Sequence, residues 1–239
     1  MSKTDKHFLF FSEHISENSI LLDRDETAHL TGVLRFGEGD EIQITDGFGC
    51  IYNCRIEKMK KDSTLCEIIS TRIVEPLSYE ITLAVGMPDK DKFEQICETA
   101  NPLGVKKIIP LITERCDKKL FDGRFEKIKE RCERKIISSS KQSLNPYLTI
   151  IENPIKLSDF VSDCELNLLA DFYGKSIFEV IDKNKLPKSM CIFVGPPAGF
   201  SDSEIENLTK FCKKIYLGKY RLRTELAAIS AVSAISHYL

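Results

Sequence analysis

Apolar and polar positions follow two different rhythms along the chain, and the change comes near residue 75. In the first part, "DEIQIT" alternates and "CIYNCRIEKM" and "STLCEIISTRI" are rich in β-branched residues, so these segments predict short strands, with a turn at "DGFG". A short helix is predicted over "DETAHLTGVLR", with Asp25 as its N-cap. Strands at this spacing predict a small barrel or sandwich over residues 1–74, and "VEPLSY" is the linker candidate.

Strands and helices alternate over residues 75–239. Strands are predicted at "EITLAVGM", "KKIIPLIT", "LNLLAD", "SMCIFVGP" and "KIYLG". Helices are predicted at "DKFEQICETANPLG", broken near Pro102, at "DGRFEKIKERCERKIISSSKQS", at "SIFEVIDKNK", at "SDSEIENLTKFCKK" and at the end of the chain. Apolar strands that alternate with helices predict an α/β domain, with a parallel sheet covered on both faces.

The composition is that of an ordinary globular protein. The 239 residues are 42% hydrophobic and 29% charged, which suffices for two domains without a disulfide or metal staple. The nine cysteines form no CxxC pair, so we expect reduced thiols in a cytoplasmic protein and no metal site. The apolar run Phe8–Phe11 is too short for a signal peptide, and no apolar stretch reaches the ~18 residues of a membrane helix.

The charge distribution places any polyanion-binding surface in the second part of the chain. The net charge is −2; residues 1–72 hold 9 Lys and Arg against 13 Asp and Glu, and residues 73–239 hold 25 against 23. A nucleic-acid surface would therefore be a local patch.

Two strand exits stand out, because ligands of parallel sheets bind beyond the carboxyl ends of the strands. In "IFVGPPAGFSDSE", glycines and prolines follow the strand, and Ser201 and Glu204 predict a capping box for the next helix. Such a backbone lets main-chain groups approach a ligand closely. It is neither GxGxxG nor a P-loop, and an ordinary tight turn remains an alternative.

The second exit, "KIYLGKYRLR", is basic. Between Lys213 and Arg223 there are five basic residues and no acidic one, which favours an anion or RNA site over a solvated edge. Thr224 is predicted to cap the last helix, whose apolar stripe would be Leu226, Ile229, Val232 and Ile235. Small residues fill much of the rest of this helix, so we expect it to be buried on more than one side.

The helix over residues 124–142 is highly charged, and a solvated face is the usual meaning of such a run. At its end, in "KQSLNPY", the polar residues Gln142, Ser143 and Asn145 could equally contact a ligand or cap the helix. No paired-carboxylate or HExxH pattern appears, so hydrolase chemistry has no support.

At these two exits the chain resembles a known family. "IFVGPPAGFSDSE" and "LGKYRLRTELAA" are similar to the last two motifs of the SPOUT methyltransferases, specifically the 16S (small-subunit) ribosomal RNA uridine-N3 methyltransferase family, which shows GPEGGFs..E and LG..-LRTETA there. "HLTGVLRFGEGDEIQITDGFG", "KDKFEQICETANPLGVKKIIPLITERC" and "KQSLNPYL" match its other landmarks in order. The resemblance implies a PUA-like β-barrel joined to a SPOUT α/β domain with a deep trefoil knot, in a homodimer.

The resemblance also implies a cofactor and a reaction: methylation by S-adenosylmethionine of ring N3 of a specific uridine in the decoding region of 16S rRNA, on the assembled small ribosomal subunit. The implied catalytic segment is Arg223, Thr224 and Glu225. As hypotheses from residue type, Arg223 stabilises the uridinate oxygens, and Glu225 or a water it orients accepts the proton. The implied cofactor-binding residues are Leu169, Ala170, Val194, Gly195, Pro196, Ala198, Gly199, Leu217, Gly218, Tyr220, Leu222 and Arg223. The implied RNA contacts are Arg35, Lys90, Lys92, Arg134, Gln142, Lys219 and Arg221. Neither a metal nor a membrane is expected.

Several positions depart from the family pattern. Pro197 and Ala198 replace Glu and Gly, and Leu226 replaces Thr. Leu144 and Asn145 follow "QS" where the family has an arginine, and "TANPLG" places Thr99 and Pro102 where the family has Lys and Glu. Two alternatives therefore stay open: a non-catalytic RNA-binding relative, and a SPOUT enzyme with a different RNA target.

Overall fold

The computed structural model describes residues 8–182 and 184–238, and the chain forms two compact units. The first comprises the residues up to Pro76 together with Ile137–Leu148; the second comprises Leu77–Ile136 and the chain from Thr149 onward. The sequence-based domains, 1–74 and 75–239, were continuous, so the return of residues 137–148 to the first unit was not foreseen. A helical pattern shows where a helix runs, but it does not show which unit each end of the helix packs on.

Specific bonds hold the returning segment in the first unit. The Tyr147 hydroxyl donates to the Val74 carbonyl (2.6 Å), and the Leu148 N–H donates to the Gly47 carbonyl (2.9 Å). The Lys141 ammonium pairs with the buried carboxylate of Glu26.

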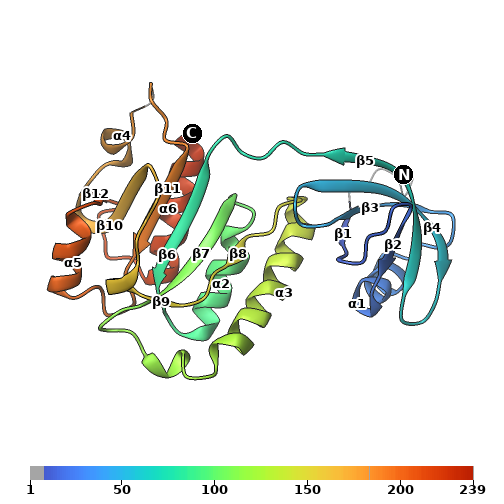
Figure 1. The fold of residues 1–239 in the computed structure, drawn as a ribbon, viewed down its shortest axis with the longest axis horizontal. Helices are drawn as coiled ribbons and strands as arrows, with labels where there is room; N and C mark the ends of the chain where they lie inside the picture. The colour runs from blue at the N-terminus through green and yellow to red at the C-terminus, as the bar shows by residue number, and fades with distance from the viewer. Residues whose placement is uncertain (1–7, 183, 239) are drawn as a thin grey trace. The chain divides into compact units, whose positions relative to one another are not determined.

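The first unit is a five-stranded sheet of order β1-β3-β4-β5-β2 around one apolar core (Figure 1). The strands are β1 (Leu9–Phe11), β2 (Ser19–Leu22), β3 (Glu41–Thr45), β4 (Cys50–Met59) and β5 (Thr64–Ile73). The last three match the predicted strands; β1 and β2 were missed because three or four residues are too few to show alternation. The segment after β1 bonds to β2, with the Leu21 N–H donating to the His14 carbonyl (3.0 Å), so the two ends of the sheet meet as a small barrel requires.

The helical segment of this unit begins earlier than predicted. Helix α1 (Arg24–Ala28) is followed by the π-helical turn η2 (His29–Val33). The predicted N-cap Asp25 was wrong: the cap is Asp23, whose carboxylate accepts a hydrogen bond from the Glu26 N–H (2.8 Å). The helix starts at Arg24, directly after strand β2 ends, which places Asp25 inside the first turn.

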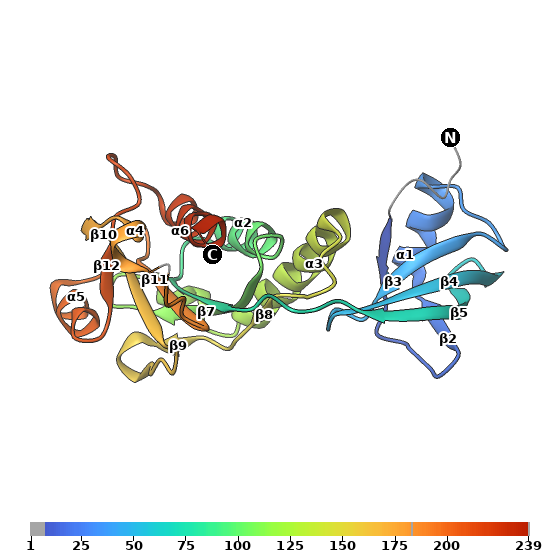
Figure 2. The same cartoon turned by 90° about the horizontal axis from the view of Figure 1, so that it is seen from above.

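The second unit contains a fully parallel sheet of order β12-β10-β11-β6-β7-β8, and β9 also pairs with β7, which confirms the predicted parallel sheet (Figure 2). Its strands are β6 (Glu80–Gly86), β7 (Val105–Ile112), β8 (Ile150–Ile151), β9 (Ile155–Lys156), β10 (Leu166–Lys175), β11 (Ser189–Val194) and β12 (Lys213–Ile215). The trefoil knot implied by the resemblance stays a prediction.

Helices cover both faces of this sheet. Helices α2 (Lys90–Ala100) and α6 (Thr224–Tyr238) pack on one another and on one face, while α5 (Asp202–Thr209) lies on the other (Figure 2). The remaining helices are α3 (Phe125–Ser143), α4 (Ile177–Val180), η3 (Lys118–Leu120) and η4 (Leu157–Asp159). The helix predicted over "SIFEVIDKNK" is therefore only the single turn α4.

Helix α6 buries Val232 and Ile235 of the predicted stripe, leaves Ile229 half-buried and exposes Leu226. Leu226 is 52% exposed, whereas Ala228, Ala231, Val232 and Ile235 are buried. The small alanine side chains allow close approach of neighbouring backbones, so they face inward and the larger Leu226 faces outward.

Among the described residues, no helix has both the length and the apolar character needed to cross a bilayer. In the same part of the chain, the His, Cys, Asp and Glu side chains form no cluster of three or more suited to a metal ion.

Candidate active site

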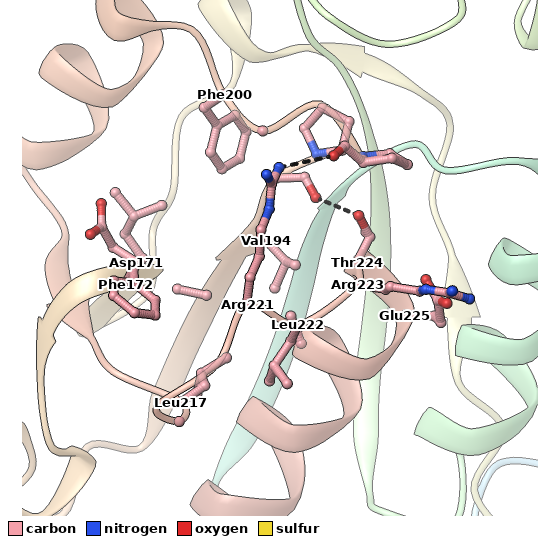
Figure 3. A pocket seen from close by; sticks show the side chains of 18 of the residues that line it. Asp171, Phe172, Val194, Phe200, Leu217, Arg221, Leu222, Arg223, Thr224 and Glu225 are labelled. Carbon is pink, nitrogen blue, oxygen red and sulfur yellow. Dashed lines mark hydrogen bonds between the residues drawn. The ribbon is translucent and has the colours of Figure 1, made fainter.

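A cavity of about 940 Å³ lies at the carboxyl ends of β10, β11 and β12, next to the first turn of α6 (Figure 3). Three segments form most of its wall: the end of β10, the loop after β11 and the loop after β12. These are the strand exits at which the parallel-sheet rule expects a ligand.

Eleven of the twelve predicted cofactor-binding residues line this cavity. They are Leu169 and Ala170 from β10; Val194, Gly195, Pro196 and Gly199 from the β11 exit; and Leu217, Gly218, Tyr220, Leu222 and Arg223 from the β12 exit. The twelfth, Ala198, is exposed and lies outside the lining. The structure thus gathers residues that lie up to 54 positions apart in the chain.

The predicted catalytic segment lies at the same cavity. Arg223, Thr224 and Glu225 all belong to its wall. Thr224 is the first residue of α6 rather than the residue before it, and its hydroxyl donates to the Gly195 carbonyl oxygen (3.0 Å). Thr224 was predicted to cap the helix, but its side chain instead bonds the first turn of α6 to the loop after β11, as the dashed line in Figure 3 shows.

A buried carboxylate braces the loop after β11. Glu204 accepts hydrogen bonds from the Ser201 N–H and, across to the exit of β7, from the Glu114 N–H, both at 2.8 Å. The Ser201 hydroxyl accepts in return from the Glu204 N–H (3.2 Å), which confirms the predicted capping box. One side chain therefore joins the exits of β7 and β11.

Two arginines donate to carbonyl oxygens of this same loop. From the β7 exit, Arg115 donates to the carbonyls of Phe200 (3.1 Å) and Ala198 (3.4 Å). From the β12 exit, Arg221 donates to the Pro197 carbonyl (3.4 Å), and Figure 3 shows its side chain reaching toward that loop. These bonds connect the loop after β11 to the segments on both sides of it.

The end of β6 approaches this loop so closely that it needs a glycine. A Cβ at Gly86 would lie 2.4 Å from Pro196 Cδ and 2.5 Å from Pro196 N. Real Cβ atoms do not come that close to backbone, so any side chain at position 86 would push the cavity wall outward.

Opposite charges meet at the rim of the cavity beside α2. The Asp89 carboxylate, which caps α2, accepts a hydrogen bond from the Lys92 ammonium (2.6 Å) and raises the pKa of that lysine. Lys92, Arg223 and Glu225 all line the cavity, where Glu225 raises and Arg223 lowers the pKa of Lys92. Figure 3 shows Arg223 and Glu225 directed away from Arg221.

The predicted RNA-contact residues do not all gather here. Lys92 and Arg221 line the cavity, and Lys219 is exposed on the same loop as Arg221. Lys90 and Arg134 are exposed on α2 and α3, outside the lining. The other two, Arg35 and Gln142, are exposed residues of the first unit.

Several lining residues were missed by the sequence analysis. Asp171, the last residue of the predicted strand "LNLLAD", lines the cavity, and the strand continues to Lys175 and adds Phe172 and Tyr173 to the wall. The Asp171 carboxylate pairs with Lys214 (3.0 Å), which also lines the cavity. The other missed residues are Pro197, Phe200, Ile205 and Ala227. Aromatic residues directly after an apolar strand were the available signal for Phe172 and Tyr173.

Each of the two units contains a segment that matches the model of a known protein family. Residues 75–236 match the model of an RNA methyltransferase domain, and residues 22–69 match that of an RNA methyltransferase PUA domain. A protein of Legionella pneumophila, solved in complex with the bound cofactor S-adenosylmethionine, has a similar fold, with a TM-score of 0.86 at 25% identity over 97% of this chain and 98% of that one.

Two sequence relatives extend over nearly the whole chain. The ribosomal RNA small subunit methyltransferase E of Aquifex aeolicus is 31% identical over 232 residues, which cover 96% of this chain and 99% of the relative. The protein of the same name from Bacillus subtilis is 30% identical over 228 residues, which cover 89% and 88%. Because the RNA methyltransferase model matches more than half of the chain and these relatives match it almost end to end, the chain belongs to the ribosomal RNA small subunit methyltransferase E family.

Proposed function

We propose that this chain transfers a methyl group from S-adenosylmethionine to ring N3 of one uridine in the decoding region of 16S ribosomal RNA. Its family makes this chain an S-adenosylmethionine-dependent ribosomal RNA methyltransferase. We propose three further points: the methylated ring atom, the target uridine, and the assembled small subunit as the form of the substrate. The observation that carries the proposal is the cavity, where the loops after β11 and β12 meet Arg223, Thr224 and Glu225. Such a substrate implies that the protein acts in the cytoplasm.

The residues around the cavity fit S-adenosylmethionine. A volume of about 940 Å³ is within the range of cofactor sites, and Leu169, Val194, Leu217 and Leu222 supply the apolar walls such sites have. Backbone groups at the three strand exits would hold the polar parts of the cofactor. When bound, the cofactor supplies the electrophilic methyl group.

The side chains at the rim would act on the uridine. N3 of uridine carries a proton, and its lone pair becomes available for the new N–C bond when that proton leaves. The Arg223 guanidinium would stabilise the negative charge that spreads onto the uracil oxygens. The Glu225 carboxylate, or a water that it orients, would take the proton.

The departures from the family pattern lie mostly away from the cavity. Leu226 is outside the lining and points outward, and Ala198 is also outside it. Pro197 does line the cavity, and its carbonyl accepts the hydrogen bond from Arg221. These placements favour an active enzyme over a relative that has lost turnover. The homodimer and the trefoil knot remain part of the proposal.

The test is methyl transfer from labelled S-adenosylmethionine to small ribosomal subunits that lack this modification, followed by mapping of the labelled nucleotide. We expect a single N3-methyluridine in the decoding region. Label at another nucleotide would keep the enzyme class and overturn the proposed target. Absence of both label and cofactor binding would make the chain a non-catalytic RNA-binding relative.

A further inference from the structure

A group of aromatic side chains lies exposed beside the cavity. Tyr173 is 87% exposed and Tyr220 is 76% exposed, and Phe172 and Tyr216 are also exposed. We call these four side chains the aromatic surface. Large rings left in water next to a binding cavity mark a surface for a partner.

A local irregularity of the sheet presents two of these rings. Ala170 and Lys175 of β10 both pair with Ile215 of β12, so residues 171–174 bulge out of the strand pairing. A Cβ at Gly174 would come within 2.3 Å of the Ile215 backbone, so the bulge needs a glycine there. Bulges next to functional sites re-aim side chains, and this one holds Phe172 and Tyr173 at the cavity wall.

The rings support one another. The Phe172 ring lies edge-on to Tyr173, with centroids 5.6 Å apart, and edge-on to Tyr216 at 6.3 Å. Phe172 is labelled in Figure 3, on the side of the cavity formed by β10. Phe172 and Tyr173 of β10 and Tyr216, which directly follows β12, therefore form a pre-arranged surface rather than independent side chains.

Positive charge surrounds the aromatic surface. The Lys219 ammonium lies 5.9 Å from the centroid of the Tyr220 ring, and Arg221 follows directly in the chain. Lys214 is paired with Asp171, the acidic side chain of the bulge. The rings lie in two segments, residues 171–174 and 213–223. Apart from the Asp171 carboxylate, every charged side chain in these segments is positive.

We propose that the aromatic surface binds single-stranded RNA next to the target nucleotide, with unpaired bases stacked on Tyr173 and Tyr216 and phosphates near Lys219. The proposal rests on the proposed function and adds to it the way in which flanking nucleotides are held. Aromatic rings interleaved with cations are how proteins bind single-stranded nucleic acid without reading its sequence. A second copy of this chain would bring the same positive charge to the surface, so an RNA fits it better.

The test is a direct binding titration with a fluorescein-labelled single-stranded oligouridylate, which requires no catalysis. In the double variant Tyr173→Ala/Tyr216→Ala we expect binding to weaken at least roughly 25-fold, because stacking contributes roughly 5- to 100-fold per base and the variant removes two rings. The variant Tyr173→Phe/Tyr216→Phe keeps the rings and should bind within about twofold of the unchanged protein. Phe178→Ala, which removes a 66% exposed ring outside the cavity lining, is the matched control and should change nothing.

Unchanged oligonucleotide binding in the alanine variant would overturn the inference. A change of that variant from dimer to monomer in sedimentation would also overturn it, because the surface would then be an interface between copies. The methyl-transfer assay separates this result from the proposed function. If the alanine variant binds the oligonucleotide more weakly but the unchanged protein does not methylate the small subunit, the proposed function alone is rejected. If the unchanged protein methylates the small subunit and the alanine variant does so with the same RNA KM, the inference alone is rejected.

Discussion

The two loops that flank the cavity are built in opposite ways. The loop after β11, Gly195–Ser201, is held in place: Pro196, Phe200 and Ser201 are buried, and the side chains of Arg115, Arg221 and Thr224 donate to its backbone carbonyls. The loop after β12, Leu217–Arg223, exposes Lys219, Tyr220, Arg221 and Arg223. One loop is a fixed wall and the other is a charged edge.

This difference separates two tasks. A small cofactor is held by groups whose positions must not vary, and a braced backbone provides such positions. A large polyanion is held by many weak contacts with charges that remain in solvent. We therefore expect changes in the braced loop to affect stability and cofactor affinity, and changes in the basic loop to affect turnover and RNA affinity.

The largest expected effect lies at the end of the basic loop. Arg223→Ala should lower kcat roughly 100- to 1000-fold, because it would remove the charge that we propose to stabilise the uridinate during transfer. The thermal unfolding midpoint should stay unchanged, since Arg223 is exposed. The measurement is steady-state methyl transfer to small subunits, with thermal unfolding in parallel. Lys213→Ala removes an equal charge from β12, outside the cavity lining, and is the control; near-normal turnover of Arg223→Ala would reject its role.

In the braced loop, Glu204→Ala should destabilise the fold by roughly 1–3 kcal/mol, because the N–H groups of Glu114 and Ser201 lose their acceptor. In a chain of this size that corresponds to about 2–4 °C in Tm for each kcal/mol. Glu206→Ala, an exposed glutamate on the same helix, should leave Tm within about 1–2 °C. Equal Tm values for the two variants would show that Glu204 does not brace the loop.

The smallest expected effect is at Arg115, whose side chain is exposed but donates to two carbonyls of the braced loop. Arg115→Ala should weaken S-adenosylmethionine binding about 2- to 10-fold and leave the RNA KM unchanged, because the two lost hydrogen bonds hold the loop and are not contacts with the cofactor itself. Calorimetric titration of the cofactor measures this, with the exposed Arg124→Ala as control. A higher RNA KM with unchanged cofactor affinity would show that Arg115 contacts RNA, and the proposed division of tasks between the two loops would then be wrong.

Much of the second unit was predictable, because its signals are local. Apolar strands followed by amphipathic helices predicted the parallel sheet, and Ser201 with Glu204 predicted a capping box that the structure contains. The rule that ligands bind beyond the carboxyl ends of parallel strands pointed to the loops that line the cavity. Where a prediction failed, as with the N-cap Asp25 or the exposed Leu226, the deciding factor was where an element begins or which face another element covers.

The amino-acid sequence by itself determined the alternation of elements, the family and the residues offered at each strand exit, because these depend on residue type and spacing along the chain. The tertiary structure decided the rest. Arg115 donates to the loop after β11, and the Glu114 N–H donates to Glu204 at the start of α5, only because β7 and β11 end at the same edge of the sheet. The bulge at residues 171–174 exists only because Ile215 of a distant strand pairs with both of its ends. Contacts between residues far apart in the chain leave no periodic trace in either segment, so only the folded chain reveals them.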